Sequence, residues 1–370
     1  MICICLFSCG KEGQSLENAP DSREEVDGKS ELDYNEKKLN IYNYYNIFDL
    51  EPAEVIIPKN QTNSQSLSIV VNDGHGNLIV FDGGRVEDAD FLCDIIKDNG
   101  GVVKDWFITH IHDDHIGALY KILSDKRTDV NIESIHYDFA NFDWYFEKMG
   151  NDAGIYYLFL KAIEDYNNYL ESINKQLVEI SHNEFTDKPY FYNSGLWFDK
   201  ESNKYLDVPS CSMNVHILNN HYELDQDPIN NTSVVYLVDI YGKNQIQMLI
   251  FGDLGYGGGE KIFDENFKFV KGEKMKGYDD YWENDYVVRE SHIVDIDNID
   301  ILVLSHHGQN GIDPELYKKF NPKVVIWPTS ADIYENVHGK YKTDDTKRIL
   351  SEMDSIEYQI ISYEETAVIR

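Results

Sequence analysis

The chain has 370 residues, of which 42% are hydrophobic, so it can bury one large core or two ordinary ones, and disorder along its whole length is excluded. Its 33 basic residues stand against 66 acidic ones, which gives a formal net charge of -33 at pH 7. Proteins that bind long nucleic acids draw much of their affinity from Lys and Arg, so the charge disfavours such partners without excluding them. A small-molecule or ester substrate fits this balance more easily.

The first 40 residues differ from the rest of the chain. Leu6-Phe7-Ser8-Cys9 closes a short apolar start and resembles the lipobox of bacterial lipoproteins, in which the cysteine becomes lipidated. A basic start and the full length of a signal peptide are missing, so a plain hydrophobic start is the alternative. Residues 10–40 are rich in Glu, Asp, Ser, Lys and Asn, which predicts a disordered tether.

From this start we expect a lipid anchor at Cys9 and a location in the cell envelope or on the extracellular surface, with a cytoplasmic location as the alternative. No apolar run of about 20 residues occurs in the rest of the sequence, so no transmembrane helix is predicted. The folded domain is expected over residues 41–370.

The first part of this domain alternates between strand and helix signals. Two β-prone runs, 67–71 and 78–81, flank a turn-forming cluster and predict a hairpin. Apolar positions near helical spacing predict a helix over 85–98, and a strand follows over 102–108.

The later part contains two insertions. Residues 136–206 carry long helical stretches rich in aromatic residues and are predicted as a mostly helical insertion. Residues 255–298 form the second insertion. Outside these insertions, strands are expected at 215–218, 233–240, 246–251, 301–304 and 324–326. Helices are expected at 314–320 and 344–353, and a last β-pair extends to residue 369. Two sets of strands with helices between and around them predict an α/β (α+β) fold, a four-layer αββα sandwich of two mixed β-sheets flanked by helices.

The densest chemical signal is His110-x-His112-x-Asp114-His115, which follows an apolar strand and precedes a predicted helix. Alternate residues of a loop at a strand end can converge on one point, and imidazole with carboxylate is a ligand set that suits zinc, iron or manganese. The chain has only 12 histidines, and a solvated turn gains nothing from gathering three of them. The segment therefore predicts a metal site.

The extended segment, Thr109-His110-x-His112-x-Asp114-His115-x-Gly117, is the signature of the metallo-β-lactamase superfamily. Three further segments resemble motifs of that family and occur in its order: Phe81-Asp82-Gly83-Gly84, Ile250-Phe251-Gly252-Asp253-Leu254 and Ser305-His306-His307-Gly308. The resemblance covers about residues 41–370 with the two insertions, and it implies a metal-dependent hydrolase.

The resemblance also implies a ligand set. Two divalent ions, zinc or alternatively manganese or iron, would share a water and lower its pKa toward neutrality. One ion would be bound by His110 and His112, Asp253 would bridge both, and the other ion would be bound by Asp114, His115 and His306. Asp82 would orient a ligand histidine, or it merely caps a turn.

A closer resemblance is to the extracellular hydrolase domain of the competence DNA-uptake protein ComEC and its free-standing relatives. It is carried by the segments Asn230-Asn231-Thr232-Ser233-Val234-Val235, Gly252-Asp253-Leu254 and His306-His307-Gly308. In that branch the segment around Asn231 and Ser233 stands where other branches supply a third histidine to the first ion. The resemblance thus implies an under-liganded first site, with Asn231 or water filling in.

Other histidines have weaker claims. His338, followed by Lys340 and Lys342, could contact the substrate from the rim of the metal site. We group it with Asp114 and Asp253 as a candidate catalytic residue. His307 could contact the substrate or orient a ligand. His216 and His221 lie near the Asn231 segment, but a lone histidine beside a strand is more often structural.

These motifs favour hydrolysis of a phosphoester or phosphodiester, because two metals can clamp the attacking and leaving oxygens of a phosphoryl displacement. Thioester or lactone hydrolysis is an alternative within the same superfamily. A non-catalytic surface-binding lipoprotein is another, and so is a redox diiron protein, although that branch usually has Glu where this chain has His112. The aromatic insertion could form a lid or a cage for apolar or cationic groups, or simply core.

Overall fold

The part of the chain that carries the fold is the unit Tyr34–Arg370. Within it, the computed structural model describes residues 36–39, 53–74, 76–182, 190–199, 204–240, 246–266 and 299–370. The lipobox-like start, most of the predicted tether and residues 267–298 of the second insertion lie outside the described residues. No helix among the described residues is long and apolar enough to cross a bilayer.

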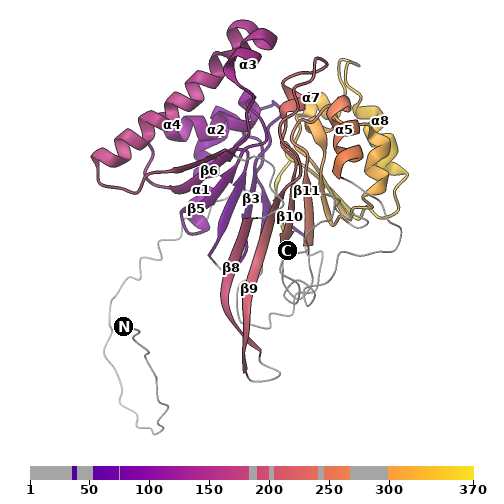
Figure 1. Ribbon diagram of the computed structural model, residues 1–370. Helices are drawn as coiled ribbons and strands as arrows, with labels where there is room; N and C mark the ends of the chain where they lie inside the picture. Colours follow the sequence, from indigo (N-terminus) through magenta and orange to yellow (C-terminus); the bar gives the residue numbers. More distant parts are fainter. Residues whose placement is uncertain are drawn as a thin grey trace, which may run out of the picture. The chain divides into compact units, whose positions relative to one another are not determined.

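Two mixed β-sheets form the centre of the unit (Figure 1). The first sheet has the strand order β1-β15-β2-β3-β4-β5-β6-β7, and the second has the order β14-β13-β12-β11-β10-β9-β8. The strands of the first sheet are β1 (Glu36–Leu39), β2 (Glu54–Ile57), β3 (Ile69–Asn72), β4 (Leu78–Phe81), β5 (Val102–Phe107), β6 (Asn131–Tyr137), β7 (Glu179–His182) and β15 (Thr366–Ile369). Those of the second are β8 (Tyr190–Asp199), β9 (Lys204–Ile217), β10 (Tyr236–Ile240), β11 (Ile246–Ile250), β12 (Ile301–Val303), β13 (Val324–Trp327) and β14 (Tyr358–Ile361).

Helices lie on the outer side of each sheet (Figure 1). On the first sheet they are α1 (Ala89–Asp98), α2 (Asp113–Ser124), α3 (Phe142–Met149) and α4 (Gly154–Ser172), and on the second they are α5 (Tyr256–Asn266), α7 (Ala331–Tyr334) and α8 (Thr343–Ser351). Short 3-10 helices connect these elements at Val86–Asp88, Gly150–Ala153, Asn230–Thr232, Ser305–Gly308 and Pro314–Lys319.

Three layers of buried apolar side chains separate the four layers of secondary structure. Alternate residues of a strand point to opposite faces of its sheet, so Tyr236 and Val238 of β10 pack between the sheets while Leu237 packs under the outer helices. On the first sheet, Trp106 of β5 packs with Leu119 of α2 in the other outer layer. The expected four-layer αββα sandwich is therefore confirmed.

The aromatic insertion differs from the prediction. Its helices end at Ser172, and the chain then forms β7, β8 and β9, although residues 136–206 were expected to be mostly helical. Tyr190 and Tyr192 of β8 explain the error, because they alternate along the strand and pack against the core between the sheets. Strand pairing also begins ahead of residue 41, since β1 runs parallel to β15.

Candidate metal centre

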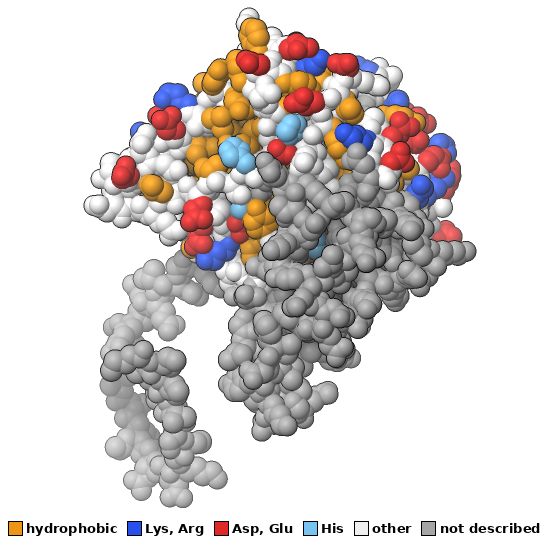
Figure 2. All heavy atoms as spheres, viewed as in Figure 1, with side chains coloured by type: hydrophobic (Ala, Val, Ile, Leu, Met, Phe, Trp, Pro, Cys, Tyr) orange, Lys and Arg blue, Asp and Glu red, His pale blue; other side chains and the backbone are white. Residues whose placement is uncertain are grey.

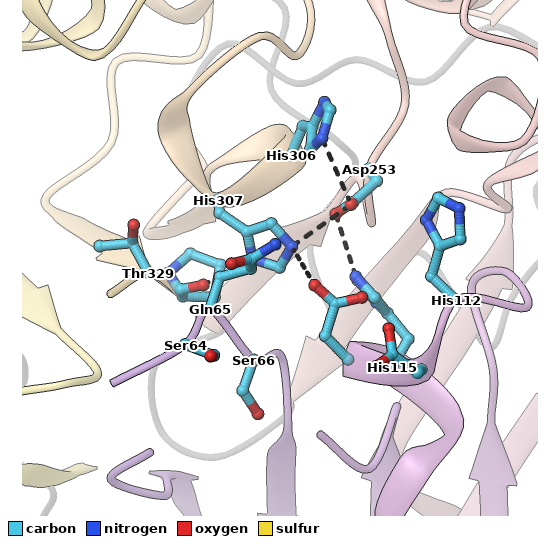
Figure 3. Close-up of polar contacts among 12 residues, drawn as sticks. Ser64, Gln65, Ser66, His112, His115, Asp253, His306, His307 and Thr329 are labelled. Atoms are coloured by element: carbon cyan, nitrogen blue, oxygen red, sulfur yellow. Dashed lines mark hydrogen bonds and ion pairs between the residues drawn. The ribbon is translucent and has the colours of Figure 1, made fainter. Parts of the chain in front are cut away.

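The chemical motifs follow the carboxyl ends of strands. Asp82 comes directly after β4, and the segment from Thr109 to His115 connects β5 to α2. Asp253 and His307 come shortly after β11 and β12. Because β4 is parallel to β5 and β11 is parallel to β12, each pair delivers its following residues to the same edge of its sheet. The strand ends therefore bring side chains from distant parts of the sequence into one cluster (Figure 3).

Two groups of potential ligands lie in this cluster. In each group the ligand atoms lie within 4.8 Å of one another, and the groups consist of His110, His112 and Asp253, and of Asp114, His115 and His307. The carboxylate of Asp253 lies between them, with Oδ1 at 3.1 Å from Nε2 of His115 and Oδ2 at 3.8 Å from Nε2 of His110. This is the position that a bridging ligand requires.

The buried polar atoms of the cluster test whether it fits metal ions. Nε2 of His115, Nε2 of His307 and Oδ1 of Asp253 are buried and make no hydrogen bond of good geometry, although they face ionisable groups at 3.1–3.3 Å. Buried polar atoms of this kind are costly unless something else satisfies them, and all three are atoms that bind zinc and similar divalent ions. The residues present therefore fit a pair of divalent cations.

Asp82 fixes the ring of His115. One of its carboxylate oxygens accepts hydrogen bonds from Nδ1 of His115 at 2.7 Å and from Oγ1 of Thr109 at 2.8 Å, and the other accepts one from the Thr109 amide at 2.8 Å. Burial raises the pKa of Asp82, and the nearby His115 offsets part of this rise. With its proton on Nδ1, the His115 ring presents the lone pair of Nε2 to Asp253 and the centre.

The two histidines of the first group are held in the neutral form that binds metals. Burial lowers the pKa of His110 well below its usual value, and the neighbouring His115 lowers it further. Burial also lowers the pKa of His112, although Asp114 and Asp253 oppose this. Nε2 of His110 lies 3.0 Å from Nδ1 of His112, so both rings turn a nitrogen toward the same point.

The structure corrects one ligand of the second group, because His307 rather than His306 lies with Asp114 and His115. Nε2 of His307 is 3.1 Å from Oδ2 of Asp114, and its Nδ1 donates to the carbonyl oxygen of Pro328 at 2.6 Å. Burial disfavours a charged ring there, but Asp253 and Asp114 outweigh it and raise the pKa of His307 to about 9.

His306 stands at the edge of the same cluster (Figure 3). Its Nε2 lies 3.8 Å from Oδ2 of Asp253 and 3.4 Å from Nδ2 of the Asn230 side chain, and its own side chain is 15% exposed. Both His306 and His307 have a positive φ, at 47° and 58°, so the chain turns sharply at this point. This turn, which the sequence does not reveal, decides which ring is buried.

The segment around Asn231 is hydrogen-bonded to the backbone at and after Asp253. Oδ1 of Asn231 accepts hydrogen bonds from the amides of Gly255 and Gly258, and its Nδ2 donates to the carbonyls of Gln226 and Asp227. Because the backbone uses all these polar positions, Asn231 is not available as a ligand, which corrects the expectation that it fills the first site. Oγ of Ser233 accepts a hydrogen bond from the Asp253 amide at 3.0 Å and so helps to position the bridging carboxylate.

The remaining histidines lie apart from the ligand groups. His338 is exposed on the turn after α7 and belongs to neither ligand group, so its contact with the substrate from the rim stays a prediction. His216 is paired with Asp239 at 2.9 Å and His221 with Asp138 at 2.9 Å, which gives both a structural partner.

The sequence did not point to Arg85, which lies next to the second group. Its Nη2 is 3.5 Å from Oδ2 of Asp114, its Nη1 is 2.7 Å from Asp113, and its Nε donates to the carbonyl of Gln65. Arg85 thus contacts the same carboxylate oxygen of Asp114 as His307 does. Its place directly after Asp82-Gly83-Gly84 was the available signal.

The chain was compared with known proteins. Residues 62–175, which include the segment from His110 to His115, match the family model of the metallo-β-lactamase superfamily. A search of curated proteins gave no match.

Solved structures of low sequence identity are also similar to this chain. The metallo-β-lactamase fold protein YhfI from Bacillus subtilis is 11% identical with a TM-score of 0.43, and the alignment covers 85% of this chain and 99% of that one. Unliganded yeast PDE1 is 11% identical with a TM-score of 0.43 and coverage of 86% and 99%. The short form of human tRNase Z is 16% identical with a TM-score of 0.29 and coverage of 69% and 92%.

The family match, the strand-end motifs and the paired ligand groups agree on one assignment. Residues 62–175 match the metallo-β-lactamase superfamily, and the chain has the fold and the paired ligand groups of a metallo-β-lactamase-fold hydrolase.

Proposed function

We propose that the domain hydrolyses a phosphoester or phosphodiester at a centre of two divalent ions. The observation that carries the proposal is the carboxylate of Asp253, which lies within 4 Å of nitrogen atoms in both ligand groups. Two ions held there would supply an activated water and stabilise the attacking and leaving oxygens of a phosphoryl displacement.

The protein's own part is to hold the ligand atoms in place before substrate binds. Nδ1 of His115 is fixed by Asp82, and Nδ1 of His307 by the Pro328 carbonyl. The backbone amide of Asp253 is fixed by Ser233. Ligands held in this way need little reorganisation when charge develops in the transition state, which favours catalysis.

The finer assignments also belong to this proposal. We propose zinc as the metal, since imidazole and carboxylate ligands suit it, with manganese or iron as alternatives. The Asn230–Thr232 turn with Ser233, and the pair His306 and His307, support a relationship to the ComEC-type branch. A lipid anchor at Cys9 with a cell-envelope location also stays a proposal.

The test is hydrolysis by the metal-loaded protein of bis-p-nitrophenyl phosphate, p-nitrophenyl phosphate, a thioester and a lactone. We expect the phosphate esters to be preferred. Asp253→Asn should reduce their hydrolysis by about two to three orders of magnitude, the scale seen when one group that stabilises the transition state is removed. Asp239→Asn is the matched control, because Asp239 is an equally buried carboxylate that binds His216 and Gln247 outside the centre.

Preference for the thioester or the lactone would refute the phosphoester assignment while keeping the hydrolase. Bound metal with no turnover of any ester would favour a binding role. Equal activity of wild type and Asp253→Asn would refute the centre itself.

A further inference from the structure

A patch of exposed apolar side chains lies on α3 and α4. Phe146, Tyr157 and Leu158 are 52%, 57% and 56% exposed. The ring of Phe142 connects them, because its centroid is 5.8 Å from that of Phe146 and 4.1 Å from that of Tyr157. We call Phe142, Phe146, Tyr156, Tyr157 and Leu158 the aromatic ledge. Figure 2 shows hydrophobic side chains gathered on this face over α3 and α4, with histidine side chains beside them.

The aromatic ledge and the loop that carries the first ligands share an apolar layer. Ile111, which lies between His110 and His112 in the sequence, is buried in the same apolar cluster as Tyr145 of α3. Phe142 and Tyr156 pack against that cluster from outside. The aromatic ledge therefore covers the same apolar layer in which Ile111 of the ligand loop is buried.

A polar contact fixes the same helix to the other side of the centre. The hydroxyl of Tyr145 donates to Oγ1 of Thr232 at 3.4 Å, and Thr232 precedes Ser233, which holds the amide of Asp253. Helix α3 is thus attached to both segments that position ligands. A group bound on the aromatic ledge has a fixed direction relative to the reacting centre.

The charge of the molecule limits what can occupy this surface. Single exposed hydrophobic side chains are ordinary, but a contiguous patch beside a site marks an interaction. Glu147, beside Phe146 on α3, is 71% exposed and pairs with Lys148, which also pairs with Asp225, so these three side chains carry a net negative charge. The whole chain carries a net charge of -33. Anionic membranes and nucleic acids are repelled by such a surface, whereas an uncharged apolar group is not.

We infer that the aromatic ledge binds an alkyl or aryl substituent of the substrate, so that the preferred ester carries a large apolar group beside the reacting phosphate. The inference rests on the proposed function, since the reacting group must be held at the metal centre. Aromatic side chains suit this role because each ring offers a large apolar surface at a low cost in conformational entropy.

The experiment compares methyl p-nitrophenyl phosphate with octyl p-nitrophenyl phosphate, which share a leaving group and differ only in the remaining substituent. The double variant Phe146→Ser/Tyr157→Ser removes the exposed rings. The control, Ile173→Ser/Leu177→Ser, removes two side chains of similar exposure, 39% and 44%, beyond the other end of α4.

We expect wild type to hydrolyse the octyl ester with a kcat/KM at least about tenfold higher than the methyl ester, mainly through KM. Shielding about two methylene groups from water is enough for this ratio. The ledge variant should lose the preference and keep its activity on the methyl ester, and the control should keep both.

Equal kcat/KM values for the two esters in wild type would overturn the inference, and so would a preference that survives in the ledge variant. If neither ester is hydrolysed, the proposed function fails, and equilibrium binding of octylphosphonate and methylphosphonate to the metal-loaded protein tests the ledge separately. Tighter octylphosphonate binding that the ledge variant loses supports the inference, and equal binding overturns it. Sedimentation with neutral phosphatidylcholine vesicles that depends on the ledge, without any ester preference, would assign the surface to membranes instead.

Discussion

The carboxylate of Asp82 offers the sharpest test of how the metal ligands are positioned, through the substitution Asp82→Asn. Asp82 is fully buried, and its hydrogen bonds to Thr109 and His115 are 2.7–2.8 Å long. Its backbone has a φ of 52°, a conformation that Asn tolerates better than most residues, so the substitution adds little strain. The side chain keeps its shape but exchanges one accepting oxygen for a donating amino group.

This exchange should change the tautomer of His115. The Thr109 amide can still donate to the remaining oxygen, but the new amino group faces Nδ1 of His115, which now has to accept. The proton of the ring then moves to Nε2, the atom that faces Asp253, and the lone pair needed for a metal is lost. Loss of such a supporting contact typically lowers metal affinity by about 10- to 100-fold, which is about 1.4–2.7 kcal/mol.

The assay is competition with a chromophoric chelator for zinc, followed by the visible spectrum of the cobalt-substituted protein. Asp105→Asn serves as the control, because Asp105 is bound by His136 of the same sheet and by Tyr192 of the other sheet but belongs to neither ligand group. The control should lower thermal stability without changing metal affinity. If Asp82→Asn binds zinc within twofold of wild type and has an unchanged cobalt spectrum, the assigned role of Asp82 is wrong.

Three further predictions follow from the same geometry. His307→Ala should remove close to one bound ion per chain while His306→Ala retains both, as measured by elemental analysis, and the opposite result would restore His306 as the ligand. Gly308→Ala should lower the free energy of unfolding by about 2–5 kcal/mol, because φ is +77° and a Cβ atom would overlap the Trp327 ring. Denaturant titration checks this, and a loss below about 1 kcal/mol would contradict the packing. Burial raises the pKa of Cys93 from 9.0 to about 12, so its alkylation in the native protein should stay slow. The rate should not show the steep rise between pH 7 and 9 that is expected of the unfolded chain. Mass-spectrometric mapping measures the rates, and fast native alkylation would contradict the burial of Cys93.

Much of the fold could be predicted because apolar periodicity reports directly on burial. The short runs before Asp82, Thr109 and Asp253 are strands, and their order along the chain indicated two sheets with helices outside. The convergence of His110, Asp114 and Asp253 was implied by the resemblance of their motifs to those of the metallo-β-lactamase superfamily. Strand ends that share an edge bring such residues together whatever their separation in sequence.

Contacts that depend on the exact path of a loop could not be predicted. His306 and His307 are identical neighbours, and only the left-handed turn there decides which of them is buried. Arg85 reaches Asp114 from another loop, so no local pattern marks their contact. Asn231 carries the same amide whether it binds a metal or the backbone, and only the positions of Gly255 and Gly258 distinguish the two.

The aromatic insertion shows the limit of periodicity. Tyrosine and phenylalanine are compatible with both strands and helices, and those after Ser172 lie on strands that the sequence did not separate from the preceding helix. The prediction was correct for α3 and α4, where the apolar positions follow a helical repeat. It was wrong where alternation in β8 places Tyr190 and Tyr192 against the core between the sheets.

The most direct test of the whole account is the metal content of the purified protein, measured by inductively coupled plasma mass spectrometry on wild type and Asp253→Asn. A carboxylate between two groups of buried imidazole and carboxylate ligands predicts close to two divalent ions per chain in wild type. It predicts fewer than one per chain in the variant. Wild-type protein that binds no divalent ion, even after incubation with zinc, manganese or iron, would contradict the account.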